Sequence, residues 1–117
     1  DHREMEIKGR DVAEGMSRSL LIGSDEVYDA ISDALTQIVR VIRETLENTP
    51  PELAADIGER GMVIAGGGAL IRDMDRRLMQ ETGLAVVIAD DPLTCVARGC
   101  GRALEDMAVL GDVFTRE

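Results

Sequence analysis

The sequence predicts an α/β fold in which a parallel βαβα unit is preceded by a β-hairpin and a long helix. The alternating segment 3–8 is typical of a half-buried strand, and residues 17–22 are interpreted as a second strand paired with it. Apolar residues then recur every three or four positions as far as residue 46, as in an amphipathic helix. The apolar runs 62–65 and 84–88 each precede a helical pattern, and this alternation favours a parallel layer with right-handed crossovers.

The first two strands are expected to form an antiparallel pair. Met5 and Ile7 would share the half-buried face of segment 3–8. Residues 9–11 form a turn signal, and a loop around 14–15 precedes the second strand at 17–22. An isolated pair of this kind is only marginally stable. We therefore expect it to belong to a larger sheet.

A long helix is predicted to follow Ser24, which is a good N-cap residue. Asp25 and Glu26 would place negative charge in the first turn, where it favours the helix dipole. The helix has one apolar stripe, interpreted as core, which consists of Val27, Ile31, Leu35, Ile38, Ile42 and Leu46.

A pair of prolines, Pro50 and Pro51, is predicted to end this helix. Thr49 is expected to cap a short helical segment that runs to about Ile57, because proline is tolerated in a first helical turn.

The second half of the chain is predicted to alternate strand, helix, strand and helix. The apolar runs 62–65 and 84–88 are typical of strands buried on both faces. Between them a helix is expected at about 69–81, stopped by a left-handed Gly83. Asp90 or Asp91 would cap a final helix to about residue 109, with Pro92 in its first turn. The inner side of the first of these helices would consist of Leu70, Ile71, Met74, Leu78 and Met79.

Composition excludes several classes of function. The chain has 117 residues, 44% of them hydrophobic, which is enough for one compact domain. Thirteen basic and 23 acidic residues give a formal charge of −10, which opposes binding to nucleic acid and to an anionic membrane surface. The two cysteines, Cys95 and Cys100, lack the spacing of a metal or redox motif and are interpreted as reduced core thiols.

Three successive glycines, Gly66, Gly67 and Gly68, are the strongest local feature. Glycines between a strand and a helix leave the main chain bare, so that a planar or phosphorylated ligand can approach it. The N-terminus of the following helix would add unpaired N–H groups. The alternative interpretation is that the glycines only permit a tight turn, and the sequence leaves both interpretations open.

Two further classes of function compete for this turn. A Rossmann-type dinucleotide-binding module of an oxidoreductase would use Gly66, Gly68 and Asp90, but Ile71 occupies the position of the third glycine. An interaction domain without any ligand is the other alternative.

Several charged residues and glycines outside the glycine-rich turn are interpreted as structural. His2, the single histidine, lies at an end expected to fray, which excludes a histidine-dependent triad. Asp90 and Asp91 are interpreted as a helix cap rather than a metal site. Gly99 and Gly101 are expected to allow close packing of the last helix against the sheet. A solvated face with minor ion pairing is expected from Arg72, Asp73, Asp75, Arg76 and Arg77.

Long blocks of the chain also resemble MreB, the family of bacterial actin homologues that determine rod shape. The resemblance is carried by EIKGRDVAEG at 6–15, TPPELAADIGERGMVIAGGGAL at 49–70, ETGL at 81–84 and ADDPLTCVARGCGRALE at 89–105. It implies a part of an actin-like (ribonuclease H-like) ATPase domain, cut from the carboxy-terminal part of a longer protein. Residues 1–24 would be the β-hairpin region of the small subdomain of the second half. Residues 25–117 would be the helical and βαβα part of the second domain.

The resemblance also implies a ligand and a site. The adenosine side of an ATP pocket would be formed by Gly66, Gly67, Gly68, Ala69 and Leu70. The residues that hold the phosphates and Mg, and those that hydrolyse ATP, lie upstream in the family. This chain is therefore expected to contain no catalytic and no metal-binding residue, although the longer protein would be an ATPase.

Partners and location follow from the same resemblance. The longer protein would assemble with copies of itself into a filament and guide cell-wall synthesis. It would act in the cytoplasm at the inner face of the cell membrane, with cell-wall elongation and membrane-anchoring proteins as partners. Nucleic acid is not expected as a partner, and this chain is not expected to touch the membrane directly.

Overall fold

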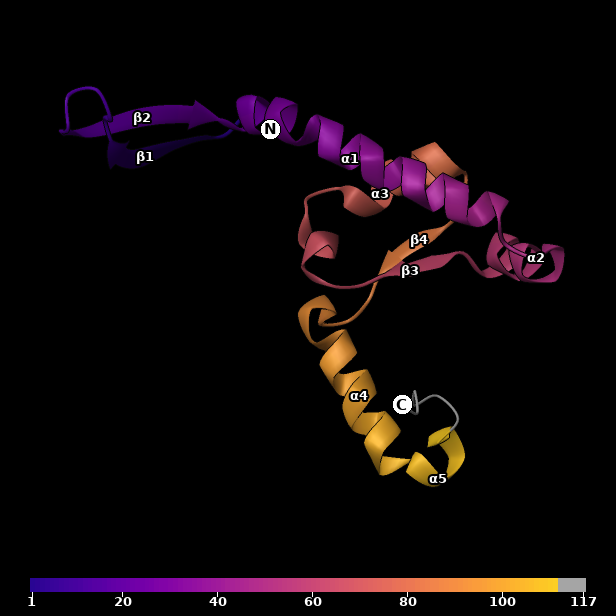
Figure 1. The fold of residues 1–117 in the computed structure, drawn as a ribbon. Helices are drawn as coiled ribbons and strands as arrows, with labels where there is room; N and C mark the ends of the chain where they lie inside the picture. The colour runs from indigo at the N-terminus through magenta and orange to yellow at the C-terminus, as the bar shows by residue number, and fades with distance from the viewer. Residues whose placement is uncertain (112–117) are drawn as a thin grey trace. The chain divides into compact units, whose positions relative to one another are not determined.

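The α/β fold predicted from the sequence is present in the computed structural model, which describes residues 1–111 (Figure 1). The chain divides into two compact units, Asp1–Glu44 and Thr45–Glu117. The predicted division at residues 24 and 25 concerns subdomains of a longer protein and stays a prediction. The last six residues of the predicted segment 25–117 lie outside the described part of the chain.

The first unit contains an antiparallel hairpin of β1 (Glu4–Arg10) and β2 (Ser17–Gly23), as predicted. Strand β1 continues through Arg10, so the turn signal at 9–11 was placed too early. The turn lies at 12–14, where the Asp11 carboxylate accepts the main-chain N–H groups of Ala13 and Glu14 at 2.9 and 3.2 Å. The Met5 side chain is 66% exposed, so the predicted half-buried face of β1 is limited to Ile7.

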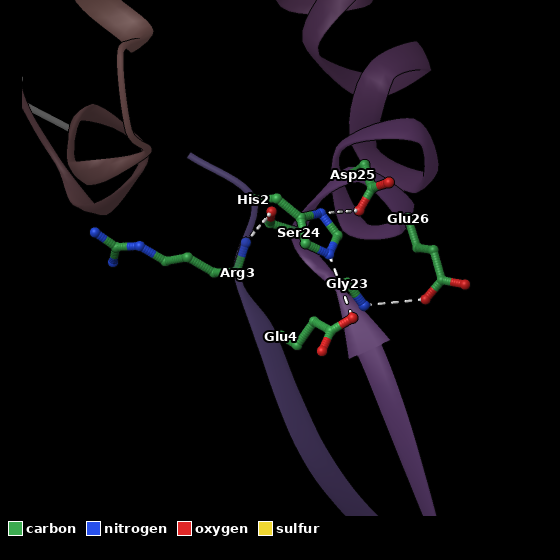
Figure 2. A network of polar contacts seen from close by, with 7 residues as sticks. All are labelled: His2, Arg3, Glu4, Gly23, Ser24, Asp25 and Glu26. Carbon is green, nitrogen blue, oxygen red and sulfur yellow. Dashed lines mark hydrogen bonds and ion pairs between the residues drawn. The ribbon is translucent and has the colours of Figure 1, made fainter.

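The start of the chain is fixed to the start of α1 (Ser24–Glu47) by polar contacts (Figure 2). The His2 ring lies between two carboxylates, with Nδ1 3.0 Å from Asp25 and Nε2 3.4 Å from Glu4. The expectation that His2 lies at a frayed end is therefore wrong. A Cβ at Gly23 would lie 2.9 Å from the ring and 2.6 Å from Asp25 Oδ1, so these two exposed side chains would have to shift to accept one.

Ser24 is the first residue of α1 rather than its N-cap, which corrects the prediction. Its hydroxyl accepts the main-chain N–H of Arg3 at 3.0 Å. The Glu26 carboxylate accepts the N–H of Gly23 at 3.1 Å. This contact is the return half of a capping box, in which the third helical residue reaches back to the residue before the helix.

The apolar stripe of α1 is centred on Leu35 and Val39, which are 4% and 5% exposed. Ile38 was predicted to belong to the stripe, but it is 42% exposed, and Val27 is 49% exposed. Val39, rather than the predicted Ile38, therefore lies on the buried face. Successive helical residues are about 100° apart, so at this point the buried face is turned by one residue from the predicted one. The half-buried members of the stripe are Ile31, Ile42 and Leu46.

Helix α2 (Pro51–Arg60) lies in the second unit and ends three residues later than predicted. Its N-cap position is occupied by Pro50, which makes no side-chain cap. The prediction that Thr49 caps this helix is wrong, because the Thr49 hydroxyl donates instead to the carbonyl oxygen of Thr45 at 2.6 Å.

The second unit is built around two parallel strands, β3 (Met62–Ile64) and β4 (Val86–Ile88), with Met62 opposite Val86. Helix α3 (Met74–Thr82) lies against β4 and completes the predicted βαβ order (Figure 1). Val63 and Val87 are 67% and 56% exposed, so the expectation of strands buried on both faces is wrong. The described residues cover only one face of this pair. Among the described residues of the unit, the buried side chains are those of Ala69, Met74, Leu78 and Val86.

Helix α3 ends as predicted. Gly83 has a φ of 72°, and its N–H donates to the carbonyl oxygen of Met79 at 2.9 Å. This left-handed residue caps the helix at little conformational cost because glycine has no Cβ.

The predicted final helix is divided into a short turn, η2 (Pro92–Thr94), and helices α4 (Cys95–Glu105) and α5 (Met107–Leu110). Gly99 and Gly101 are exposed, and a Cβ at either position would meet no atom within 4 Å. The expectation that they allow close packing is therefore wrong. Both cysteines are free, as predicted, but Cys100 is exposed and does not belong to the core.

No helix within residues 1–111 combines the length and the apolar composition needed to cross a membrane.

Candidate functional site

The glycine turn, defined as residues 66–68, follows β3 after Ala65. Gly66 has a φ of 82°, a conformation that L side chains rarely adopt. Its N–H donates to the carbonyl oxygen of Pro92 at 2.8 Å, which ties the turn to η2. The backbone therefore requires glycine at position 66.

The same requirement does not hold for Gly67 and Gly68. Both belong to the short helical turn η1 (Gly67–Leu70), and neither has a positive φ. A Cβ at Gly68 would meet no atom within 4 Å, and a Cβ at Gly67 would lie 3.4 Å from the flexible end of Leu93. Both residues are exposed. The fold would accept side chains at these two positions, and their absence leaves bare main chain at the surface.

The two residues after the glycines face opposite ways. Ala69 is 3% exposed and belongs to the core of the second unit, whereas Leu70 is 57% exposed. Leu70 was predicted to lie on the inner side of the helix, and its exposure corrects that expectation. The structure therefore places Gly67, Gly68 and Leu70 together at the surface, with the Ala69 methyl group behind them.

The expected helix over 69–81 is interrupted, which changes the chemistry of the turn. Ile71 is extended, with φ −60° and ψ 128°, and Asp73 is left-handed with a φ of 58°. Helix α3 consequently begins only at Met74. The glycine turn therefore does not lead directly into the N-terminus of α3, so the helix-dipole anion site considered from the sequence is not formed by this helix.

The turn that faces the glycines is held by a side chain that sequence reasoning missed. Asp91 precedes η2 with a φ of 46°, and its carbonyl oxygen accepts the N–H of Thr94 at 3.1 Å. The Arg98 guanidinium donates to the carbonyl oxygens of Asp90 and Asp91 at 2.6 and 3.2 Å, and to the Thr94 hydroxyl at 3.0 Å. Main-chain carbonyl acceptors leave no pattern in a sequence, so no signal there indicated this role for Arg98.

The acidic residues beside the site form neither a side-chain cap nor a metal centre. Asp91 takes the N-cap position of η2 but makes no side-chain cap hydrogen bond, which corrects the predicted role of the pair. Within residues 1–111, no group of three or more potential ligands is placed to hold a metal ion.

The charged segment around the start of α3 is only partly a solvated face. Arg76 and Asp73 lie 3.9 Å apart as an exposed ion pair, which is expected to contribute little to stability. Asp75 and Arg77 are half-buried, so the expectation of a fully solvated face is wrong for these two residues.

The geometry does not favour a dinucleotide-binding module. That motif places the glycine loop directly at a helix N-terminus, where the pyrophosphate binds. Here Ile71 stands in the extended segment between the glycine turn and α3, and α3 begins six residues after Gly68.

Comparison with known proteins identifies the family. The MreB/Mbl protein family matches residues 1–112. The cell shape-determining protein MreB of Escherichia coli is 54% identical over 116 residues, which are 98% of this chain and 33% of that protein. The cell shape-determining protein Mbl of Bacillus subtilis is 42% identical over 106 residues, or 91% of this chain and 32% of that protein.

Solved structures agree with these relatives. MreB5 of Spiroplasma citri bound to ADP matches with a TM-score of 0.84 and 36% identity, over 97% of this chain and 34% of that one. The same protein bound to AMPPNP also has a TM-score of 0.84, with 38% identity over 92% of this chain and 32% of that one. The chain thus spans about a third of the length of the proteins it matches. It belongs to the MreB/Mbl protein family, and its α/β fold is part of the actin-like fold of MreB5.

Proposed function

We propose that this chain is the carboxy-terminal part of an ATP-dependent, actin-like filament protein and forms the adenosine-side wall of its nucleotide pocket. The observation that carries the proposal is the presence of glycine at positions 67 and 68, where the backbone conformation does not require it. A ligand that packs on bare main chain explains this choice, whereas a tight turn explains only Gly66. The similar MreB5 structures contain ADP and AMPPNP, which are ligands of this chemical class.

The residues at 67–70 would contribute to such a wall in different ways. Gly67 and Gly68 would let the base and ribose approach the main chain, and the exposed Leu70 side chain would pack beside the base. Ala69 would contribute only main-chain atoms, because its methyl group is buried. The nucleotide supplies the phosphoanhydride bond that is hydrolysed in the longer protein. Phosphate, Mg and the attacking water would be held by residues outside this chain.

The proposal for the longer protein's role is supported by the relatives, which are named for determining cell shape. We infer that it polymerises with copies of itself in the cytoplasm, at the inner face of the cell membrane, and guides cell-wall synthesis. Nucleotide state would bias the closure of its domains, and filament contacts would respond to that closure. Cell-wall elongation and membrane-anchoring proteins would be its partners.

Valine substitutions at the glycine turn test the nucleotide proposal in the longer protein. Gly67→Val and Gly68→Val should weaken binding of ADP by about tenfold or more, because a branched side chain would stand where the ligand packs. Gly58→Val on α2 is the matched control, since a Cβ there also meets no atom within 4 Å. Unchanged ADP affinity in both turn variants would favour an interaction domain without a ligand.

Filament formation needs a separate test, because a nucleotide pocket does not by itself imply a polymer. The longer protein should sediment as polymer with ATP and lose that behaviour with Gly68→Val, while Gly58→Val leaves it intact. The unsubstituted protein and the two variants are each sedimented with and without ATP. If ATP changes the sedimentation of none of the three, nucleotide binding is not coupled to assembly.

A further inference from the structure

The Arg98 side chain on α4 reaches back to the segment that follows β4. Its Nη2 atom lies 2.6 Å from the Asp90 carbonyl oxygen, 3.2 Å from that of Asp91 and 3.5 Å from the Cys95 sulfur. Its Nε atom donates to the Thr94 hydroxyl at 3.0 Å. The planar guanidinium thus makes several contacts at fixed angles, which a flexible ammonium group does not reproduce.

The segment that Arg98 holds contains a strained residue. Asp91 has a φ of 46°, a left-handed conformation that is uncommon for a residue with a side chain. The Asp91 carbonyl oxygen also accepts the Thr94 N–H at 3.1 Å and the Thr94 hydroxyl at 3.3 Å. Charge-assisted hydrogen bonds from Arg98 to the Asp90 and Asp91 carbonyls stabilise this turn against relaxation.

The same segment supports the glycine turn on its other side. The Pro92 carbonyl oxygen accepts the Gly66 N–H at 2.8 Å, and Leu93 lies against Gly67, 3.4 Å from where a Cβ would stand. A shift of residues 90–94 would therefore move the acceptor of Gly66 and the support behind Gly67. Arg98 touches neither glycine, yet it fixes the segment on which both depend.

We propose that Arg98 is a positioning residue that holds the glycine turn in the geometry required for binding an adenine nucleotide. The nucleotide part of this inference rests on the proposed function, whereas the positioning part rests only on the contacts within the second unit. Arg102 supplies a matched control, because it is an arginine one turn further along α4 whose Nε lies 3.7 Å from the exposed Asp106 carboxylate.

Amide hydrogen exchange of the isotope-labelled chain tests the positioning directly. Arg98→Ala should accelerate exchange of the Gly66 amide by about fivefold or more, because its acceptor loses its support. The Met62 amide, which donates to the Ala85 carbonyl oxygen at 2.8 Å in the β3–β4 pair, should exchange as before. Arg102→Ala should leave both amides unchanged, and Arg98→Lys should restore part of the Gly66 protection.

Titration of ADP into the longer protein, carrying the same substitutions, separates this inference from the proposed function. Weaker ADP binding in Arg98→Ala, by about threefold to tenfold, together with faster Gly66 exchange supports the whole inference. Faster Gly66 exchange without ADP binding in any protein supports the positioning role and contradicts the proposed function. Unchanged Gly66 exchange in Arg98→Ala overturns the positioning role. If Arg98→Ala unfolds, the Met62 amide will exchange as fast as the Gly66 amide. The exchange rates of these two amides in Arg98→Lys then decide the question.

Discussion

Gly61 lies directly against the main chain of Ala85, so closely that a Cβ atom at Gly61 would collide with the Ala85 carbonyl oxygen. That oxygen accepts the N–H of Met62 at 2.8 Å, in the hydrogen bond that leads into the β3–β4 pair. Gly61 also has a φ of 81°. Close approach and left-handed backbone both demand glycine at the entrance to the parallel sheet.

Gly61→Ala should therefore destabilise the chain by about 2 kcal/mol or more, because the added Cβ meets backbone and the conformation is strained. Gly58→Ala, three residues earlier on α2, is the control. It should stabilise by about 0.5–1 kcal/mol, because a Cβ there meets nothing within 4 Å and alanine favours the helix. Urea unfolding measures both, and equal effects of the two substitutions would contradict the account.

Alanine substitutions in α4 test whether its glycines serve packing. Gly99→Ala and Gly101→Ala should each stabilise by up to about 1 kcal/mol, because both positions are helical, exposed and open. Thermal unfolding of the 117-residue chain measures the change. A loss of stability would show that α4 packs closely against another surface at these glycines.

The capping contact at α1 predicts a difference between two substitutions of Glu26. Glu26→Ala should cost about 0.5–1 kcal/mol, because the Gly23 N–H loses its acceptor. Glu26→Gln should retain most of the stability, since an amide oxygen can accept the same N–H. Exchange of the Gly23 amide and unfolding in urea check both. Equal losses in the two variants would indicate that charge, rather than the hydrogen bond, is what matters at this position.

Periodicity predicted the elements of this fold well because most of them have strong local signals. The alternation at 3–8 and the left-handed stop at Gly83 are such signals, and the structure confirms the hairpin and the stop. The break after Leu70 was missed because apolar residues keep helical spacing through it. Nothing in that spacing reveals that Asp73 adopts a left-handed conformation.

The candidate site could be predicted only in part, because only some of its features leave a local signal in the sequence. Glycines are visible in a sequence, so the turn at 66–68 was identified before its geometry was known. Which glycine the backbone requires depends on φ and on neighbouring atoms, and only the structure separates Gly66 from Gly68. Arg98 was missed because its partners at Asp90 and Asp91 are carbonyl oxygens, which every residue carries.

The central claim is that an adenine nucleotide packs on the glycine turn. It is tested most directly by adding Mg-ATP and, separately, NADH to the isotope-labelled chain while backbone amide shifts are followed. The account predicts ATP-induced shifts centred on residues 66–70, with weak affinity and little response to NADH. Stronger binding of NADH, with shifts that extend to Asp90, would contradict the account and favour a dinucleotide-binding module.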